Sequence, residues 1–186
     1  MIKKNQFLII IILIFLMTGC ANVQVSQDYS ADYVFGIDNS FGWNKTFPRE
    51  NSGLLQQDEL LAKRFKKAIE NALVGRGFQQ SSSPELLVSC VYTVSPMLRS
   101  DPVNSGFGFG YGRYGRYGTI GINSGTSIRQ YQQGMLMINI HSARSGGLIW
   151  KGTGTREVYT HSSPEDISNM VTEIVNAVVN QFPPTR

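Results

Sequence analysis

Residues 128–159, IRQYQQGMLMINIHSARSGGLIWKGTGTREVY, decide the fold. Within this stretch Leu136, Ile138 and Ile140 alternate with other residues, and a glycine-containing segment follows at residues 142–147. Alternation with a period of two is typical of a strand that buries one face. We therefore predict two antiparallel strands joined by a turn at residues 142–147.

The second of these strands carries a pattern of its own. Leu148 and Trp150 predict its buried face, and Gly152 and Gly154 continue that face without side chains. Glycine inside a strand often marks a place where another part of the backbone comes close. We expect a helix or another backbone to pack tightly there.

Two segments on either side of the hairpin have the periodicity of helices. Residues 56–74 place apolar side chains on one helical face, and Gly75 or Gly77 can end this helix with Phe78 folding back. In the last segment Ser163 can cap a helix and Pro164 suits its first position. Its apolar stripe comprises Ile167, Val171, Ile174, Val178 and Phe182.

Three further segments predict strands, at residues 23–29, 33–43 and 84–98, the second of them short or irregular. Strands that bury one face and two amphipathic helices are best satisfied by two layers. We predict an α+β two-layer sandwich, with a mixed, mainly antiparallel sheet and both helices on one face. The first helix should connect two parallel strands.

Composition limits the function classes. The chain has 186 residues, 41% apolar and 16% charged, with a formal net charge of +4. These values exclude a wholly disordered chain, a coiled coil and a polytopic membrane protein. Removing Lys3 and Lys4, which lie in a predicted leader, from the 17 basic residues leaves 15 against 13 acidic ones. A net charge of +2 is too small for nucleic-acid binding.

The amino terminus predicts a secretory signal. Residues 7–17 are an unbroken apolar run of eleven, which is too short to span a bilayer and long enough for a signal-peptide core. Residues 16–20, LMTGC, resemble the bacterial lipobox, which implies a lipoprotein signal peptide at 1–19 and lipidation of Cys20, with palmitate among the acyl chains. Ala21 then favours the outer membrane. An ordinary secretory signal with a chance cysteine is the alternative.

Several segments resemble the bacterial lipoprotein family called domain of unknown function 4136. The resemblance lies in residues 75–78, 84–88, 133–140, 143–146, 148–152 and 181–184. It implies that residues 20–186 form a single periplasmic α+β domain, tethered to a membrane and without established catalytic residues. Asn139 and Ser142 replace residues that are commonly acidic in the family, so no cation-binding role is carried over.

A glycine-rich segment at residues 105–125 is the candidate contact for a partner or ligand. Its aromatic and arginine side chains could stack on sugar rings or on a protein partner. These side chains are Phe107, Phe109, Tyr111, Arg113, Tyr114, Arg116 and Tyr117. The alternative is a loosely packed loop, because glycine is entropically costly to order. Residues 110–115 match the dinucleotide-binding fingerprint, but no helix follows, so we discount the match.

No other motif indicates catalysis or a cofactor. His141 and His161 are the only histidines and have no closely spaced acid or cysteine, so we expect no metal site. With Cys20 lipidated, Cys90 is the one remaining thiol, which excludes an internal disulfide. Cys90 lies in an apolar strand segment, and we expect a buried small hydrophobe rather than a nucleophile.

The sequence therefore predicts a lipid-anchored envelope lipoprotein in the outer membrane, facing the periplasm. We expect a non-enzymatic interaction or assembly module, attached to the membrane through its anchor and part of a larger envelope complex. No cofactor and no nucleic-acid partner are expected. The alternative is a domain that binds cell-wall glycan or a small ligand, or a hydrolase, with Arg113, Arg116 and the nearby tyrosines as its site.

Overall fold

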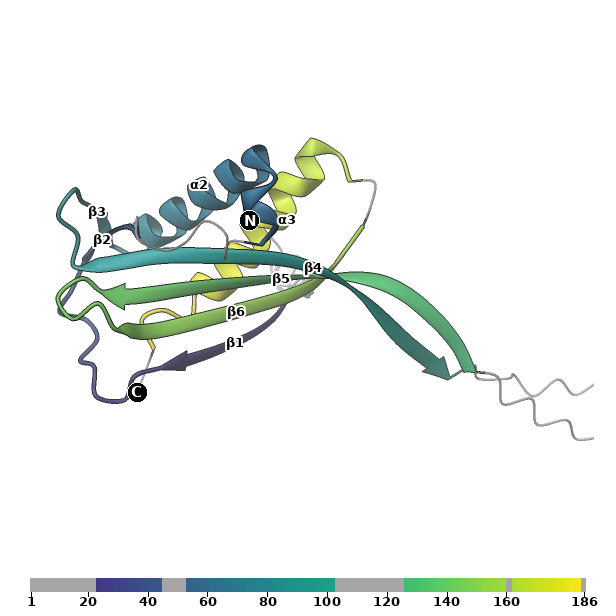
Figure 1. Cartoon of the computed structure of the whole chain (residues 1–186), viewed down its shortest axis with the longest axis horizontal. Coiled ribbons are helices and arrows are strands. Elements are labelled where there is room, and N and C mark those ends of the chain that lie inside the picture. The colour runs from purple at the N-terminus through teal and green to yellow at the C-terminus, as the bar shows by residue number, and fades with distance from the viewer. Residues whose placement is uncertain (1–22, 45–52, 103–125, 160–161, 185–186) are drawn as a thin grey trace, which may run out of the picture.

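The structure is a computed structural model that describes residues 23–44, 53–102, 126–159 and 162–184, with only the backbone of residues 99–102 and 126–129. Its strands are β1 (Gln24–Tyr29), β2 (Ser40–Trp43), β3 (Gln79–Gln80), β4 (Leu86–Pro102), β5 (Thr126–Ser142) and β6 (Leu148–Val158). Its helices are α2 (Glu59–Gly75) and α3 (Pro164–Val179), with a short 3₁₀ turn, η2 (Leu54–Gln56), before α2 (Figure 1).

The six strands form one sheet in the order β1-β6-β5-β4-β2-β3. Strand β2 pairs in parallel with β3 and β4, because α2 carries the chain back between them, and all other pairs are antiparallel. The sheet is therefore mixed and mainly antiparallel, as the sequence predicts.

Both helices lie on one face of this sheet (Figure 1). The core between the two layers comes from alternate positions of the central strands, including Val88, Ile138 and Trp150, and from the apolar stripes of α2 and α3. The predicted α+β two-layer sandwich is thus confirmed.

Helix α3 packs closely on β6 at the two glycines that the sequence singles out. A Cβ atom on Gly152 would lie 2.7 Å from Val178, and one on Gly154 would lie 2.6 Å from the same side chain. The expected close approach of a helix is confirmed, and these positions leave room for the valine.

Helix α2 is capped at both ends, and its C-terminal end follows the predicted signal. The side chain of Asp58 accepts a hydrogen bond from the backbone N–H of Leu61 at the start of α2. At its end Gly77 has a φ of 93°, and Phe78 is buried with its N–H donated to the carbonyl of Leu73. Gly77 rather than Gly75 therefore supplies the left-handed residue.

One residue of the predicted hairpin lies elsewhere than expected. Leu148 is 48% exposed, whereas Trp150 is buried. The register shifts between Ile140 and His141, so that His141 pairs with Leu148 and Ile140 pairs with Trp150. This irregularity breaks the alternation at the start of β6, and placing Leu148 on the buried face was wrong.

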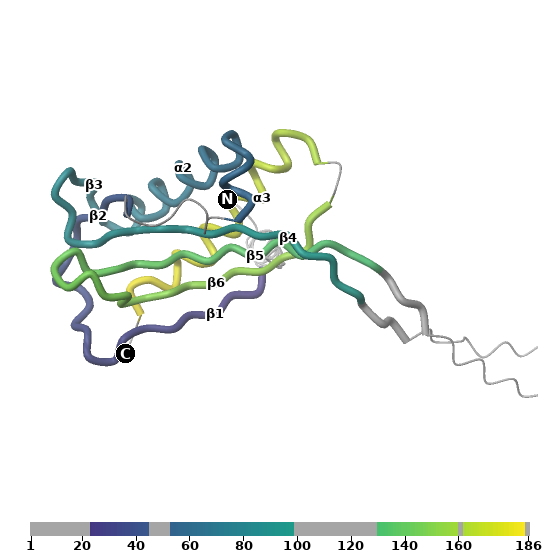
Figure 2. The backbone as a smooth tube through the Cα atoms, in the orientation of Figure 1, coloured from purple at the N-terminus to yellow at the C-terminus, as the bar shows by residue number. Residues whose placement is uncertain are grey.

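Strands β4 and β5 are longer than the sequence predicts and project beyond the sheet (Figures 1 and 2). The last β6 pair is Gln132 with Val158. Beyond it β4 and β5 pair only with each other, from Met97 with Tyr131 to Pro102 with Thr126. We call these paired segments, residues 97–102 and 126–131, the ribbon. No helix within the described ranges is long and apolar enough to cross a membrane.

Candidate binding surfaces

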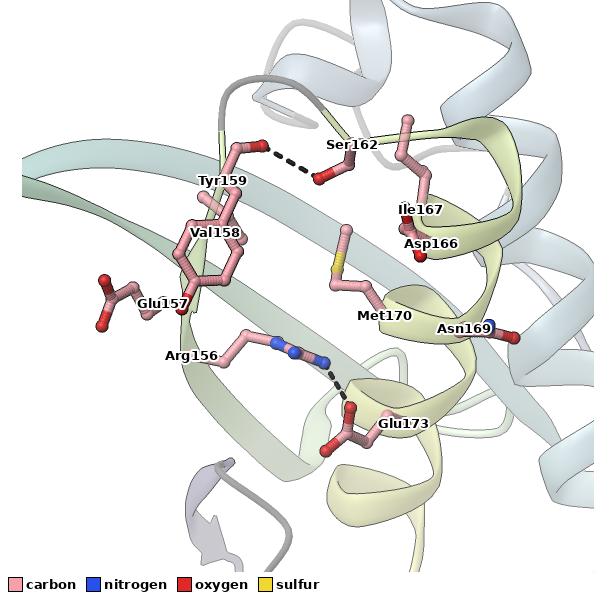
Figure 3. Close-up of a pocket in the computed structure, with 10 residues that line it drawn as sticks. All are labelled: Arg156, Glu157, Val158, Tyr159, Ser162, Asp166, Ile167, Asn169, Met170 and Glu173. Atoms are coloured by element: carbon pink, nitrogen blue, oxygen red, sulfur yellow. Dashed lines mark hydrogen bonds and ion pairs between the residues drawn. The ribbon is translucent and has the colours of Figure 1, made fainter.

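A pocket of about 380 Å³ lies at the root of the ribbon, between the end of β6 and the first half of α3 (Figure 3). Arg156 of β6 and Glu173 of α3 form an ion pair across it. Met170 and Val158 supply apolar walls. Because the two opposite charges meet each other, the pocket has no uncompensated charge from this pair with which to select an ion.

Tyr92 of β4 packs beside this pocket. Its hydroxyl lies 4.0 Å from the sulfur of Met170, and its ring packs against Phe65 with centroids 4.7 Å apart. Burial raises the pKa of Tyr92 above its ordinary value, although the nearby Arg156 opposes that shift. Gly134 makes room for the hydroxyl, because a Cβ atom there would overlap it. The ribbon therefore leaves the body from a packed, aromatic base.

A polar cluster occupies the opposite end of the sheet. The carboxylate of Glu85 accepts hydrogen bonds from the hydroxyl of Ser40 and from the backbone N–H groups of Asn39 and Ser40. These bonds, the Ser40 hydroxyl first, lower the pKa of Glu85. The Tyr33 hydroxyl donates to Asp38, and burial followed by this carboxylate raises the pKa of Tyr33 to about 12. The cluster binds the β1–β2 connection to the start of β4.

Strand β1 is one edge of the sheet, and all six of its residues are exposed. The N–H of Ser30 donates to the carbonyl of Ile149, so every second residue before it also points its backbone toward β6. The backbone groups of Val25, Gln27 and Tyr29 therefore point outward. Among the described strands β3 forms the other edge, and it is only two residues long.

The predicted lipidation site, Cys20, lies outside the described residues, and so does the predicted partner or ligand contact. That contact comprises Phe107, Phe109, Tyr111, Arg113, Tyr114, Arg116 and Tyr117. The structure does place the two residues that flank this segment: Pro102 and Thr126 are paired at the far end of the ribbon.

Of the histidines and Cys90, the structure describes His141 and Cys90. His141 alternates with buried Ile140, so it lies on the face away from the helices, and its Nδ1 is buried without a hydrogen-bond partner. His161 lies outside the described residues. Cys90 packs against the core, and burial raises its pKa to about 12. The side chain is half-buried rather than fully buried, and its thiol is protonated at neutral pH. In the part of the chain that the structure describes, no group of acids, histidines and cysteines could hold a metal ion.

Sequence reasoning missed the Arg156–Glu173 pair and the role of Tyr92. The three residues lie on β6, α3 and β4, far apart in the chain, and no motif links them. Only the strand register and the placement of α3 bring them together.

The family model for the domain of unknown function DUF4136 matches residues 25–184. The chain belongs to this family. The match spans nearly all of the described residues of this DUF4136 chain and confirms the resemblance found in its sequence. A search of curated proteins finds no match.

Two solved structures are similar to the DUF4136 chain. A PDZ domain protein from Parabacteroides distasonis ATCC 8503 is 16% identical with a TM-score of 0.55, over 98% of this chain and 41% of that protein. This chain thus spans about two fifths of that protein's length, and the likeness shows the fold alone. The PelC dodecamer from Paraburkholderia phytofirmans is 12% identical with a TM-score of 0.42, over 88% of this chain and 99% of that one.

Proposed function

We propose that this DUF4136 chain is a lipid-anchored envelope lipoprotein of the outer membrane that faces the periplasm and works as a non-enzymatic interaction module in an envelope complex. The anchor is Cys20, whose sequence context resembles the lipobox. Each buried methylene contributes about 0.8 kcal/mol, so two or three acyl chains hold a protein stably on a membrane.

The exposed edge strand β1 is the main observation that supports a role as an interaction module. Three of its residues, Val25, Gln27 and Tyr29, direct backbone groups outward. An extended segment of a partner can add to such an edge through main-chain hydrogen bonds. Natural sheets protect their edges, for example by keeping an edge strand very short, as β3 is. A six-residue exposed edge therefore supports strand addition by a partner.

The described polar groups support a binding role more than a catalytic one. Arg156 is paired with Glu173, and the carboxylate of Glu85 is held by Ser40 and Asn39. These charges stabilise connections between elements of the fold.

The anchor and the edge are tested separately in intact cells. Mass analysis of the purified chain should show a leader cut before Cys20 and a diacylglyceryl group on its sulfur. An unmodified, uncleaved leader or a freely secreted chain would contradict the anchor.

For the edge, Val25→Pro removes an outward N–H, whereas Val25→Thr keeps it and serves as the matched control. Crosslinking in cells should capture a partner protein with the unsubstituted chain and with Val25→Thr, and this capture should be lost with Val25→Pro. Equal capture by both variants, or recovery of the chain only as a free monomer, would refute strand addition at β1.

A further inference from the structure

We propose that the ribbon is a second membrane contact, lying against the same lipid surface that holds the anchor. This inference rests on the tether at Cys20 in the proposed function. It follows from where the chain enters the sheet and where the ribbon leaves it.

The start of β1 and the ribbon lie at the same end of the sheet. Gln24, the first residue of β1, pairs with Thr155 of β6. Thr155 pairs with Met135 of β5, and Met135 pairs with Thr93 of β4, so these four residues lie at the same level of the sheet. From that level β4 continues toward the ribbon, while β1 runs the opposite way. Strand β1 therefore begins at the ribbon end of the sheet, as Figure 1 shows.

The lengths restrict where the bilayer can lie. Cys20 precedes Gln24 by four residues, which span at most about 14 Å. Measured from Thr93, the ribbon ends nine residues away at Pro102, about 30 Å at 3.3 Å per residue. In the other direction the sheet continues for seven residues to Leu86, about 23 Å. A tether of about 14 Å cannot pass that far end, so the bilayer does not lie beyond it, whereas a bilayer beside the ribbon is within reach of the tether.

The chemistry of the ribbon suits a lipid surface. Met97 is 41% exposed and Leu98 is 71% exposed. The ribbon sequence holds two arginines and one aspartate, a net charge of +1, and the register pairs Arg99 with Arg129. Apolar residues combined with positive charge are typical of segments that bind anionic bilayer surfaces. A two-stranded ribbon is marginally stable by itself in water, so a supporting surface would also stabilise it.

The test supplies the tether chemically, so that it does not depend on acylation in cells. The mature chain, residues 20–186, contains every residue of the described core and is coupled through the Cys20 thiol to a maleimide lipid. Cys90 does not compete, because burial raises its pKa to about 12 and keeps its thiol protonated. The vesicles contain phosphatidylethanolamine and phosphatidylglycerol, with or without brominated acyl chains that quench tryptophan fluorescence.

Two tryptophan variants with nearly equal exposure are compared. Leu98→Trp places the probe on the ribbon, and Ile37→Trp, at a site 69% exposed in the β1–β2 connection, serves as the matched control. Trp43 and Trp150 are present in both variants, and the unsubstituted chain gives their background. We expect brominated lipid to cause a loss of the added Leu98→Trp fluorescence and no loss for Ile37→Trp. Vesicles of phosphatidylcholine, which carries no net charge, should give a smaller loss of Leu98→Trp fluorescence.

Each outcome decides the proposal. Unchanged Leu98→Trp fluorescence in tethered protein would overturn the ribbon contact while leaving the lipid anchor of the proposed function intact. A blue shift that depends on protein concentration and not on vesicles would assign the ribbon to a second copy of the chain, and would also overturn it. Conversely, quenching of Leu98→Trp together with an unacylated Cys20 in cells would support the ribbon contact and refute the proposed anchor.

Discussion

The packing of α3 against β6 depends on two residues that have no side chain, Gly152 and Gly154. A Cβ atom on Gly154 would lie 2.6 Å from Val178 and 3.1 Å from Ile174. Overfilling a packed core costs about 1–3 kcal/mol, so Gly154→Ala should lower the free energy of unfolding by that amount. Urea unfolding followed by circular dichroism measures it.

Gly75→Ala is the control for this substitution. Gly75 ends α2, and a Cβ atom there would meet nothing within 4 Å. Alanine is the better helix former, so this variant should be unchanged or slightly more stable. If Gly154→Ala were as stable as Gly75→Ala, the close approach of α3 would be refuted.

The raised pKa of the Cys90 thiol predicts that the protein loses stability at alkaline pH. Burial raises the pKa of its thiol from 9.0 to about 12. Below pH 9 the thiol is protonated in both states and has no effect. As the pH rises above 9, the unfolded chain loses the thiol proton while the folded chain keeps it, so the free energy of unfolding falls. In Cys90→Ala this part of the fall between pH 9 and about 10 should disappear. An identical pH dependence in both proteins would contradict the raised pKa.

The role of a single residue could be predicted from the sequence where it depends on neighbouring residues or on a repeating pattern. Gly152 and Gly154 could be predicted because they continue a strand face, and Ser163 because capping is a short-range signal. Arg156 and Glu173 could not, because their meeting depends on how a helix lies across a strand. Leu148 was misplaced because alternation alone does not reveal an irregular register.

Helix α3 begins with a reciprocal cap whose contribution should depend on pH. The Ser163 hydroxyl accepts from the backbone N–H of Asp166, and the Asp166 carboxylate accepts from the N–H and hydroxyl of Ser163. Ser163→Ala should cost about 1 kcal/mol at neutral pH. Ser168→Ala, which removes a hydroxyl bonded to the carbonyl of Pro164 inside the helix, should cost little.

Acid should reduce the difference in the free energy of unfolding between Ser163→Ala and Ser168→Ala. The bonds from Ser163 lower the pKa of Asp166 below its ordinary 3.8, so the carboxylate stabilises the fold above that pH and this contribution is lost as the pH falls. Urea unfolding of both variants at about pH 7 and about pH 3 makes the measurement. A Ser163→Ala cost that stays constant between these conditions would contradict the role of the carboxylate.

The elements themselves could largely be predicted, but their extent could not. Both helices and four of the six strands correspond to segments with clear periodicity, and β2 lies in the segment predicted to be short or irregular. The parallel crossover through α2 follows from the order of these elements. The two-residue β3 is too short to leave a pattern. The ends of β4 and β5 were missed because each strand is paired there only with the other, and the pairing of two strands alone does not impose an alternating pattern.

At the scale of the whole molecule, the sheet and the two helices, which we call the body, should be about as stable without the ribbon as with it. A variant in which Pro96 is joined to Gln132 by an Asn-Gly turn lacks residues 97–131 and keeps every pair of β5 with β6. Because the ribbon contributes no residue to the described core, the free energy of unfolding should change by no more than about 0.5 kcal/mol. Urea unfolding measures this change.

A deeper deletion provides the contrast. Removing residues 93–135 instead cuts into the part where β4, β5 and β6 lie together, including the site of Gly134 beside Tyr92. That variant should be much less stable. If both deletions destabilised the body equally, the ribbon would be part of its folding unit.

The pairing of β1 with β6 has a consequence for biosynthesis. The strand that leaves the ribosome first among the described ones completes its hydrogen bonds only with the strand that is made last. Such distant pairing delays folding, because the intervening chain must be ordered before the contact forms. The first strand therefore stays unprotected until the last strand is available to pair with it, and a prematurely terminated product would expose that strand to proteases and chaperones.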